Sequence, residues 1–361
     1  MSRIATCTVD PGALRHNLAC ARRAAPHSRV IAVIKADGYG HGAPGVARAL
    51  ASAADRFAVA RMDEALALRA GGVVQPLLLL AGALAPADVD TAAAQGLELV
   101  VHSAWQVELL ERARPAQPVG VWLKVDSGMH RVGVDPGAAP ALWRRLDRAA
   151  AVAGTPRLMT HLACGDQPDN AHTAAQLATF AAATAGLAAE RSIANSAGVL
   201  NWPESHGDWI RPGIMLYGGS PRAGVSGPEL GLRPAMNLDT RLIAVYSRQP
   251  GDTVGYGAAG VCPEAMNVGV AAIGYGDGYP RHARQGTPVL VNGRRAALLG
   301  RVSMDLITVD LRQVPEAQVG DPVRLWGEGL PADEVAACAG TIAYELFCRV
   351  APRVARRELE E

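Results

Sequence analysis

The sequence shows no excess of charge of one sign. Of its 361 residues, 35 are lysine or arginine and 34 are aspartate or glutamate, which leaves a formal net charge of +1. There is no long block of like charge either. Because proteins that bind polyanions usually carry a clear basic excess, we do not expect nucleic acid as a partner.

The sequence also lacks a long hydrophobic run. The longest strongly apolar stretch, residues 73–85, is interrupted by Gln75 and Pro76. The first ten residues have no continuous apolar segment of the kind found in signal peptides. Since a membrane-spanning helix needs about 20 apolar residues, we expect a cytoplasmic protein without membrane contact.

No two cysteines show the C-x-x-C spacing of metal sites. The spacing of the cysteines predicts neither a metal centre nor a disulfide framework, and we interpret them as reduced thiols. The six are Cys7, Cys20, Cys164, Cys262, Cys338 and Cys348.

What the sequence does contain is a repeated alternation of short apolar runs and amphipathic segments between residue 30 and about residue 216. This alternation is typical of βα units around a parallel sheet. Eight such runs predict a (β/α)8 barrel of the TIM type. The runs are residues 30–34, 57–60, 77–80, 97–101, 119–125, 157–161, 192–195 and 209–216.

Helices are predicted over residues 62–69 and 103–112, and another is expected to begin at Asp10 or Pro11. After about residue 231 the pattern changes to strands separated by turns. Asn292-Gly293 predicts a hairpin, and residues 331–340 predict a late helix. We therefore predict a barrel over residues 1–231, whose first ten or so residues pair with a second, mainly β domain over residues 232–361.

Polar residues follow the apolar runs of the barrel. Functional groups in such barrels lie at the carboxyl ends of the strands, so we expect these residues to converge on one mouth. They include Lys35, Lys124, Arg131, His161, Ser196 and Arg211.

Lys35 ends the first apolar run. Burial lowers the pKa of a lysine from about 10.4, which makes the free amine a usable nucleophile for Schiff-base chemistry. An isolated lysine at a strand end is more often a side chain that reaches toward solvent. The glycine-rich run with Tyr39 that follows Lys35 disfavours that alternative, because small residues let an anion approach the backbone.

Several segments together resemble the motifs of alanine racemases, which are pyridoxal-phosphate enzymes of fold type III. The resemblance runs almost from end to end, and the motifs are specific in combination although each is weak alone. They are Val-Ile-Lys35-Ala-Asp-Gly-Tyr39-Gly-His-Gly, Lys124-Val-Asp-Ser-Gly-Met-His-Arg131, Asn195-Ser196-Ala, Arg211-Pro-Gly213-Ile214, Val-Gly-Tyr256-Gly, Gly274-Tyr275-Gly-Asp-Gly-Tyr and Gly300-Arg-Val-Ser-Met304-Asp305.

The resemblance implies that Lys35 carries pyridoxal 5'-phosphate as an internal aldimine. It further implies that Arg211 faces the pyridine nitrogen, where a guanidinium donates a hydrogen bond without protonating the ring. The residues implied to hold the phosphate are Tyr39, Ser196, Gly213 and Ile214.

Racemisation needs a proton to leave one face of the α-carbon and another to arrive on the opposite face, so two bases are expected. The resemblance assigns one base to Lys35 and the other to Tyr256, supported by His161, which hydrogen-bonds Arg211. It implies a homodimer in which Tyr256 reaches the partner's site. Without the resemblance, Tyr256 would be interpreted as an aromatic residue in a turn or at a sheet edge. His161 would be interpreted as a core histidine with its hydrogen bonds made.

The resemblance places the substrate carboxylate on Arg131 and on the backbone amide of Met304. Lys124 matches a position that is often carbamylated, and an ordinary ion pair between Lys124 and Asp126 is the open alternative. Pro352 occupies an inner-gate position where many family members have an aromatic or aliphatic residue, which bears on pocket width and substrate breadth. Residues implied at the entrance are Tyr275, Arg281, Arg301 and Asp305.

The implied function is interconversion of L-alanine and D-alanine through an external aldimine, for peptidoglycan synthesis or alanine catabolism. The runner-up is a broad-specificity amino-acid racemase. A decarboxylase on the same architecture would need a C-E-S-x-D run, which is absent. A single-barrel cofactor-handling protein would lack the roughly 130 residues that follow the barrel and carry Tyr256 and Met304.

Overall fold

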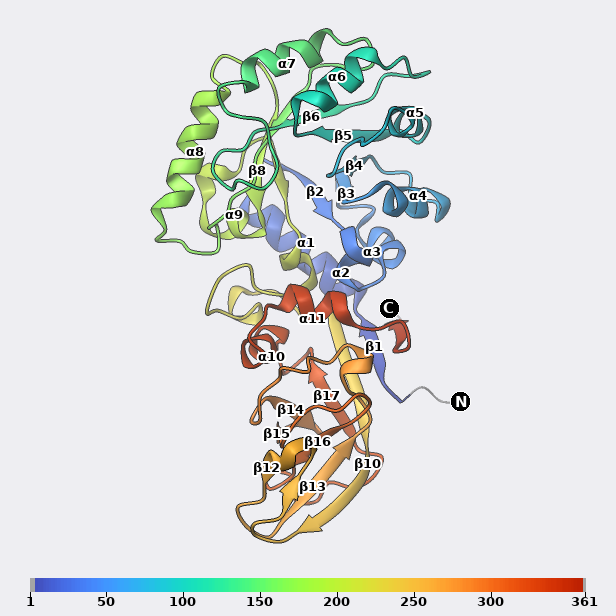
Figure 1. The fold of residues 1–361 in the computed structure, drawn as a ribbon, viewed down its shortest axis with the longest axis vertical. Coiled ribbons are helices and arrows are strands. Elements are labelled where there is room, and N and C mark those ends of the chain that lie inside the picture. Colours follow the sequence, from blue (N-terminus) through green and yellow to red (C-terminus); the bar gives the residue numbers. More distant parts are fainter. Residues whose placement is uncertain (1–3, 360–361) are drawn as a thin grey trace.

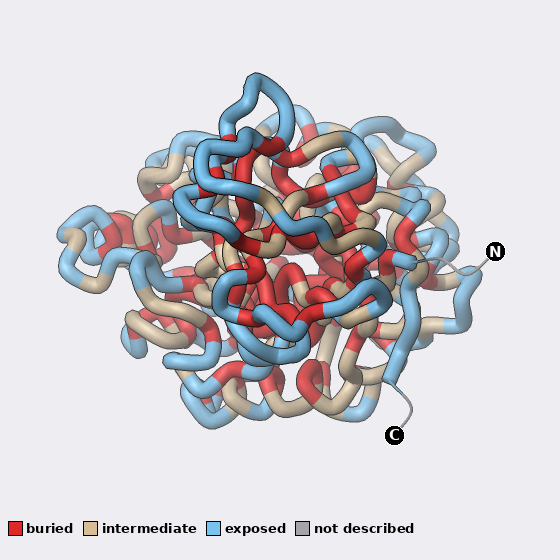
Figure 2. The backbone as a smooth tube through the Cα atoms, turned by 90° about the horizontal axis from the view of Figure 1, so that it is seen from below, coloured by how far each residue is buried: buried red, intermediate tan, exposed pale blue. Residues whose placement is uncertain are grey.

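The computed structural model describes residues 4–359, and these form two parts stacked along the long axis of the molecule (Figure 1). The first three and last two residues of the predicted domains lie outside the described residues. Figure 2 shows buried chain gathered in the interior, with exposed loops around it. No helix within residues 4–359 is long and apolar enough to cross a bilayer.

The first part is a closed parallel barrel of eight strands, as the alternating apolar runs predict. Each strand pairs with the next, and the first barrel strand closes the ring by pairing with the last. The strands are β2 (Arg29–Val33), β3 (Arg56–Val59), β4 (Leu77–Leu79), β5 (Leu97–Val101), β6 (Val121–Lys124), β7 (Arg157–Met159), β8 (Arg191–Asn195) and β9 (Trp209–Arg211).

The last run differs from the prediction. The strand expected over residues 209–216 ends at Arg211, and residues Ile214–Tyr217 form the 3-10 helix η2 instead. Pro212 has no backbone N–H with which to continue the strand pairing. All four residues of η2 are buried, and a fully buried helix cannot be distinguished from a strand by hydropathy periodicity alone.

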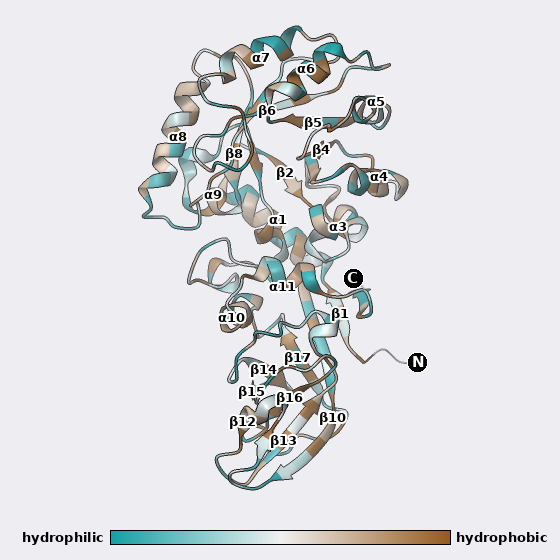
Figure 3. Ribbon diagram, viewed as in Figure 1, coloured by the Kyte–Doolittle hydropathy of each residue, from teal (hydrophilic) through white to brown (hydrophobic). Residues whose placement is uncertain are grey.

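Helices surround the barrel, whose strands are largely hydrophobic (Figure 3). The predicted start at Asp10 is confirmed, because its carboxylate accepts a hydrogen bond from the amide of Ala13 at 3.0 Å and caps α1. The helices are α1 (Pro11–Ala24), α2 (Lys35–Tyr39), α3 (Ala43–Leu50), α4 (Met62–Ala70), α5 (Pro86–Ala94), α6 (Ala104–Arg112), α7 (Ala139–Arg148), α8 (Ala171–Ala183) and α9 (Ser196–Asn201).

The second part is built on an eight-stranded sheet in the order β13-β16-β15-β14-β17-β10-β1-β18. The predicted hairpin is confirmed, with Asn292 and Gly293 both at positive φ in the turn. The strands are β1 (Thr6–Val9), β10 (Met236–Arg248), β13 (Met266–Ala271), β14 (Pro288–Val291), β15 (Arg294–Leu298), β16 (Ile307–Asp310), β17 (Pro322–Trp326) and β18 (Ala355–Glu358), with a small pair β11 (Thr253–Val254) and β12 (Gly260–Val261) beside them.

Strand β1 and helix α11 connect the two parts. Strand β1 pairs with β10 and β18 before the chain enters α1 of the barrel. The predicted late helix is α10 (Ala332–Cys338), and a further helix, α11 (Ala343–Arg349), lies between the two parts (Figure 1). A boundary at residue 231 falls in the connection between β9 and β10, and it stays a prediction.

Candidate active site

A cavity of about 510 Å³ opens at the carboxyl ends of the barrel strands. The barrel explains its position, because most of the lining residues lie at or after the carboxyl end of a barrel strand, and two more lie on α11. Nine residues predicted from the sequence line it: Lys35, Tyr39, Lys124, Arg131, His161, Ser196, Arg211, Gly213 and Ile214.

Lys35 begins a turn of unusual handedness. Its neighbours Ala36, Asp37 and Gly38 all have positive φ, and so does Tyr39. A left-handed conformation costs roughly 1–2 kcal/mol for each non-glycine residue, so the surrounding structure must hold this turn in place. Burial lowers the pKa of Lys35, and the nearby charge of Arg131 lowers it further. A lowered pKa favours the neutral, nucleophilic amine.

His41 is one of the residues that hold the turn. Its Nδ1 lies 3.1 Å from the carbonyl oxygen of Gly38 and 2.9 Å from that of Tyr39. Both partners are acceptors, so Nδ1 carries the hydrogen and donates. Burial lowers the pKa of His41 to about 4, and its Nε2 has no hydrogen-bond partner within residues 4–359. The imidazole is therefore neutral near pH 7.

The residues predicted to hold a phosphate lie together. The Ser196 hydroxyl accepts a hydrogen bond from the amide of Gly213 at 2.8 Å. A Cβ on Gly213 would lie 2.5 Å from the Tyr39 hydroxyl oxygen, so only glycine leaves room between them. Ile214 is the first residue of η2, where an amide has no partner within its own helix. Two hydroxyls and two amides in this arrangement fit a phosphate group.

Arg211 is buried, with 5% of its surface exposed. Its guanidinium donates to the Ser192 hydroxyl at 2.6 Å and to the Thr160 carbonyl at 2.5 Å. It also approaches Nδ1 of His161 at 3.4 Å, the pairing that the family resemblance implies. Burial lowers the pKa of Arg211 to about 10, so it still carries its proton at neutral pH.

His161 is surrounded by positively charged side chains. Burial lowers its pKa well below the usual value, and the charges of Arg211, Lys124 and Arg131 lower it further. The imidazole is therefore neutral and can accept the hydrogen bond from Arg211. Since a neutral histidine adds no charge, the positive potential of this cavity comes from its lysines and arginines.

Lys124 does not pair with Asp126, which was the open alternative. One carboxylate oxygen of Asp126 accepts hydrogen bonds from the amides of Gly128 and His130, within its own turn. Within residues 4–359 neither Lys124 nor Arg131 has an ion pair. Burial, followed by the charges of Arg211 and Arg131, lowers the pKa of Lys124 to about 8.

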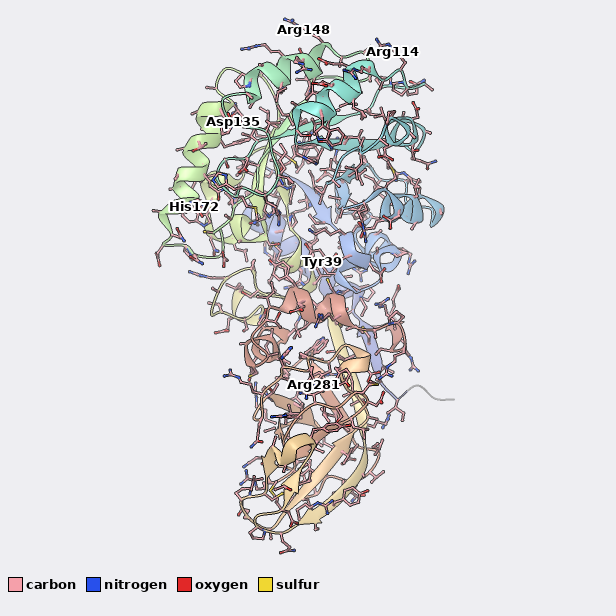
Figure 4. The ribbon with its side chains drawn as sticks, viewed as in Figure 1. Tyr39, Arg114, Asp135, Arg148, His172 and Arg281 are labelled. Atoms are coloured by element: carbon pink, nitrogen blue, oxygen red, sulfur yellow. The ribbon has the colours of Figure 1, made fainter. Side chains whose placement is uncertain are left out.

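The other predicted residues lie in the second part of the chain and do not line this cavity. Tyr256 and Met304 are 66% and 54% exposed. Tyr256 precedes β12, which Figure 1 places at the end of the molecule away from α2. Figure 4 likewise shows Tyr39 near α11 and Arg281 within the second part. The remaining residues of this set are Tyr275, Arg301 and Asp305.

Pro352 is exposed and is not part of the cavity lining. It adjoins Arg353, whose guanidinium joins Asp277 at 2.7 Å and Asp305 at 2.8 Å. The inner-gate role of Pro352 therefore has no support within one chain, and it stays a prediction.

Sequence reasoning assigned no role to two cavity residues on α11, Tyr344 and Cys348. The Tyr344 ring lies 6.0 Å from the ring of Tyr39. A signal was available, because Ala343, Leu346 and Phe347 show the spacing of a buried helix face. Asn195 and Thr160 also line the cavity without having been assigned a role.

A second cavity, of about 790 Å³, adjoins the first. The two share His161, Asn195 and Tyr344, so Tyr344 stands at their junction. The larger cavity is bounded by the loop around residues 220–229 and by α10 and α11. The strongly shifted pKa values belong to the smaller cavity, which we therefore take as the chemical site.

Comparison with known proteins gives a consistent result. Residues 9–221 match the family model for the alanine racemase N-terminal domain, and residues 235–358 match the C-terminal domain. The chain is 55% identical to an alanine racemase of Halorhodospira halophila over 360 residues, 100% of this chain and 99% of that protein. It is also 55% identical to an alanine racemase of Nitrosococcus oceani over 351 residues, which cover 96% of this chain and 97% of that protein.

Solved structures agree. The biosynthetic alanine racemase from Pseudomonas aeruginosa superposes with a TM-score of 0.96 at 48% identity, covering 99% of this chain and 100% of that one. The alanine racemase from Acinetobacter baumannii gives a TM-score of 0.93 at 35% identity, with coverage of 99% and 100%.

Proposed function

The chain belongs to the alanine racemase family, and on that premise we propose that it interconverts L-alanine and D-alanine with pyridoxal 5'-phosphate as cofactor. The observation that carries the proposal is the Lys35 amine, held in a cavity beside two hydroxyls and two amides that fit a phosphate. Burial keeps the pKa of this amine below that of an ordinary lysine.

Six residues would hold the cofactor. The Lys35 amine would bind its aldehyde carbon covalently, and the Arg211 guanidinium would donate a hydrogen bond to its ring nitrogen. Because the pKa of Arg211 is about 10, this donor keeps its proton and leaves the ring nitrogen unprotonated. The phosphate would bind to Tyr39, Ser196 and the amides of Gly213 and Ile214.

Bound pyridoxal phosphate draws electrons from the α-carbon of an attached amino acid, so that the α-proton becomes acidic. The protein then has to move a proton at that carbon. Lys35 would take or deliver it on one face, and the partner subunit's Tyr256 would do so on the other. His161 would act indirectly, by accepting a hydrogen bond from Arg211.

The substrate carboxylate would bind Arg131 of the barrel and the backbone amide of the partner subunit's Met304. We propose that Lys124 is carbamylated, because its lowered pKa supplies the neutral amine that reacts with carbon dioxide. A carbamate is an anion and would give Arg131 the ion-pair partner that no residue within 4–359 provides. Arg131 would then be fixed in position to receive alanine.

We also propose a two-fold homodimer with two shared sites. Tyr256 and Met304 are exposed, and neither lines the cavity of its own chain, so a second copy is the simplest source of both groups. The entrance roles expected for Tyr275, Arg281, Arg301 and Asp305 belong to the same proposal. The relative from Pseudomonas aeruginosa is described as biosynthetic, which supports supply of D-alanine for peptidoglycan as the role. The cytoplasmic location stays a prediction.

The test has two parts. Borohydride treatment of the purified protein should fix the cofactor on Lys35, as mapped by peptide mass spectrometry, and label on Lys124 would contradict the assignment. Incubation with each L-amino acid should form the D-enantiomer from alanine far faster than from the others. Comparable rates across many amino acids would instead favour the broad-specificity racemase.

A further inference from the structure

The left-handed turn after Lys35 is tied to the neighbouring βα loop by one carboxylate. Glu64 is the third residue of α4, and its Oε2 accepts hydrogen bonds from the amides of Ala60 at 2.8 Å and Arg61 at 3.0 Å. Its other oxygen, Oε1, accepts a hydrogen bond from the amide of Ala36 at 2.5 Å. Glu64 therefore joins the end of β3 to the residue that follows Lys35.

The barrel contains an internal comparison for this carboxylate. Asp88 is the third residue of the next helix, α5, and one of its oxygens accepts from the amides of Leu84 at 2.7 Å and Ala85 at 2.9 Å. These two hydrogen bonds correspond to those that Glu64 accepts from Ala60 and Arg61 at the start of α4. Asp88 makes no third bond to a neighbouring loop within residues 4–359. An aspartate thus suffices to cap such a helix, and the extra length of Glu64 serves the contact with Ala36.

The position of that contact matters because the turn is costly to maintain. Ala36 and Asp37 are non-glycine residues at positive φ. His41 secures the far side of the turn through the carbonyls of Gly38 and Tyr39, but those bonds lie three or more residues beyond Lys35. Glu64 acts one peptide unit from Lys35 and presents a negative charge toward its amine.

We propose that Glu64 is a positioning residue for the Lys35 amine: it clamps the Ala36 amide and so fixes the direction in which the lysine side chain leaves the barrel. This role rests on the proposal that Lys35 carries the cofactor and moves the α-proton. Misplacing a reacting group by about 1 Å can cost about 100-fold in rate, so loss of the clamp affects turnover more than substrate binding.

The charge of Glu64 has a second effect on the same amine. It raises the pKa of Lys35, against burial and Arg131, which lower it. Cys348, Lys124 and His161 also interact electrostatically with Lys35, and the other ionisable residues that line the same cavity are Tyr39, Arg61, Arg211 and Tyr344. Removal of the carboxylate charge should therefore lower the pKa of Lys35 and shift the acidic limb of the kcat profile to lower pH.

The deciding experiment compares Glu64→Asp with the matched control Asp88→Glu, both in the full-length holoenzyme. Glu64→Asp retains the charge and the helix cap but is too short to reach Ala36. We expect amide exchange in the peptide covering residues 35–41 to accelerate about tenfold, because one hydrogen bond to a charged group is lost. We expect kcat to fall about tenfold to a hundredfold, while KM changes less than about twofold. Asp88→Glu should change neither.

A Glu64→Asp variant with wild-type exchange and wild-type kcat would overturn the proposal, and so would a rise in KM with an unchanged kcat. If Glu64→Asp does not fold, Glu64→Gln provides the second measurement through the pH profile of kcat. An unshifted acidic limb in that variant would contradict the proposal. Borohydride labelling of Lys35 in the wild-type protein tests the cofactor assignment separately, so failure of one claim can be distinguished from failure of the other.

Discussion

The two ends of the barrel differ in how their charged side chains are paired. At the amino ends of the strands, arginines and glutamates neutralise one another. Arg56 meets Glu98 at 3.0 Å, and Arg157 meets Glu98 at 3.3 Å and Glu190 at 2.8 Å. Trp122 donates to Glu98 at 2.7 Å, which adds a further hydrogen bond to the network.

At the carboxyl ends, four cations face the cavity without an ion pair within residues 4–359: Lys35, Lys124, Arg131 and Arg211. Grouping like charges is costly unless an anion arrives to balance them. A cofactor phosphate, a substrate carboxylate and a lysine carbamate are the anions that the proposed function supplies. On the proposed function, charge at the amino ends stabilises the fold and charge at the carboxyl ends binds the ligands, as in other barrels of this type.

The substitution with the largest expected effect on activity is the removal of the Lys35 amine. In Lys35→Met we expect racemisation to fall to the background of the assay, because both the covalent anchor and one base are lost. The free energy of unfolding of the cofactor-free protein should not decrease, since the variant removes a half-buried cation without an ion pair. Thermal unfolding at fixed protein concentration measures this. A clear loss of stability would show that Lys35 also serves the fold.

Glu98→Gln probes the opposite end. Two arginines would lose their shared carboxylate, and we expect the free energy of unfolding to drop by about 2–3 kcal/mol. The activity of each folded molecule should be unchanged, because Glu98 is remote from the cavity lining. Urea unfolding and a racemisation assay on the same sample decide the point.

The matched control for Glu98→Gln is Glu108→Gln. Glu108 forms an exposed pair with Arg112 at 3.8 Å on α6, and its loss should cost less than about 0.5 kcal/mol. If Glu98→Gln lowered activity as strongly as stability, the division between the two ends would not hold.

The proposed carbamate on Lys124 should respond to pH. The pKa of the Lys124 amine, about 8, lies below that of free lysine. The reactive neutral amine therefore predominates above about pH 8 and is lost as the pH falls. With 13C-labelled bicarbonate, a carbamate resonance should weaken between about pH 9 and about pH 7 and be absent in Lys124→Arg. In Lys124→Ala we expect KM for alanine to rise about tenfold, because Arg131 loses a charge-assisted hydrogen bond. A resonance that persists in Lys124→Arg would place the carbamate elsewhere.

The smallest effect is expected at the surface of the second part. Asp305 pairs with Arg353, and its side chain is 61% exposed. Asp305→Asn should change the free energy of unfolding by less than about 0.5 kcal/mol. Asp277→Asn should cost more, because Asp277 also accepts a hydrogen bond from the amide of Gly274 at 2.9 Å and is largely buried. Equal effects in urea unfolding would contradict this ranking.

The barrel could be predicted because each of its strands carries a local signal, an apolar run bounded by a polar strand end. Lys35, His161 and Arg211 were found in the same way, since their positions follow from where strands stop. The 3-10 helix over Ile214–Tyr217 was misread as strand because its burial hides any periodicity. The short helix α11, which carries Tyr344 and Cys348, was not predicted at all.

Other features depend on the folded chain. The contact between Glu64 and Ala36 joins residues 28 apart, and no spacing rule in the sequence brings them together. The left-handed turn after Lys35 contains alanine and aspartate at positive φ, where local propensity alone favours glycine. The pairing of Tyr256 with a barrel site came only from family resemblance, because Tyr256 does not line the cavity of its own chain.

The central claim is that each active site combines Lys35 of one subunit with Tyr256 of the other. Mixing inactive Lys35→Ala subunits with inactive Tyr256→Ala subunits tests it most directly. After random exchange, half of the dimers are mixed and one of their two sites has both bases, so activity should return to about a quarter of wild type. Subunit exchange is verified independently with a mass label on one variant. If both bases came from one chain, no mixture could restore a site, and an inactive mixture despite proven exchange would contradict the account.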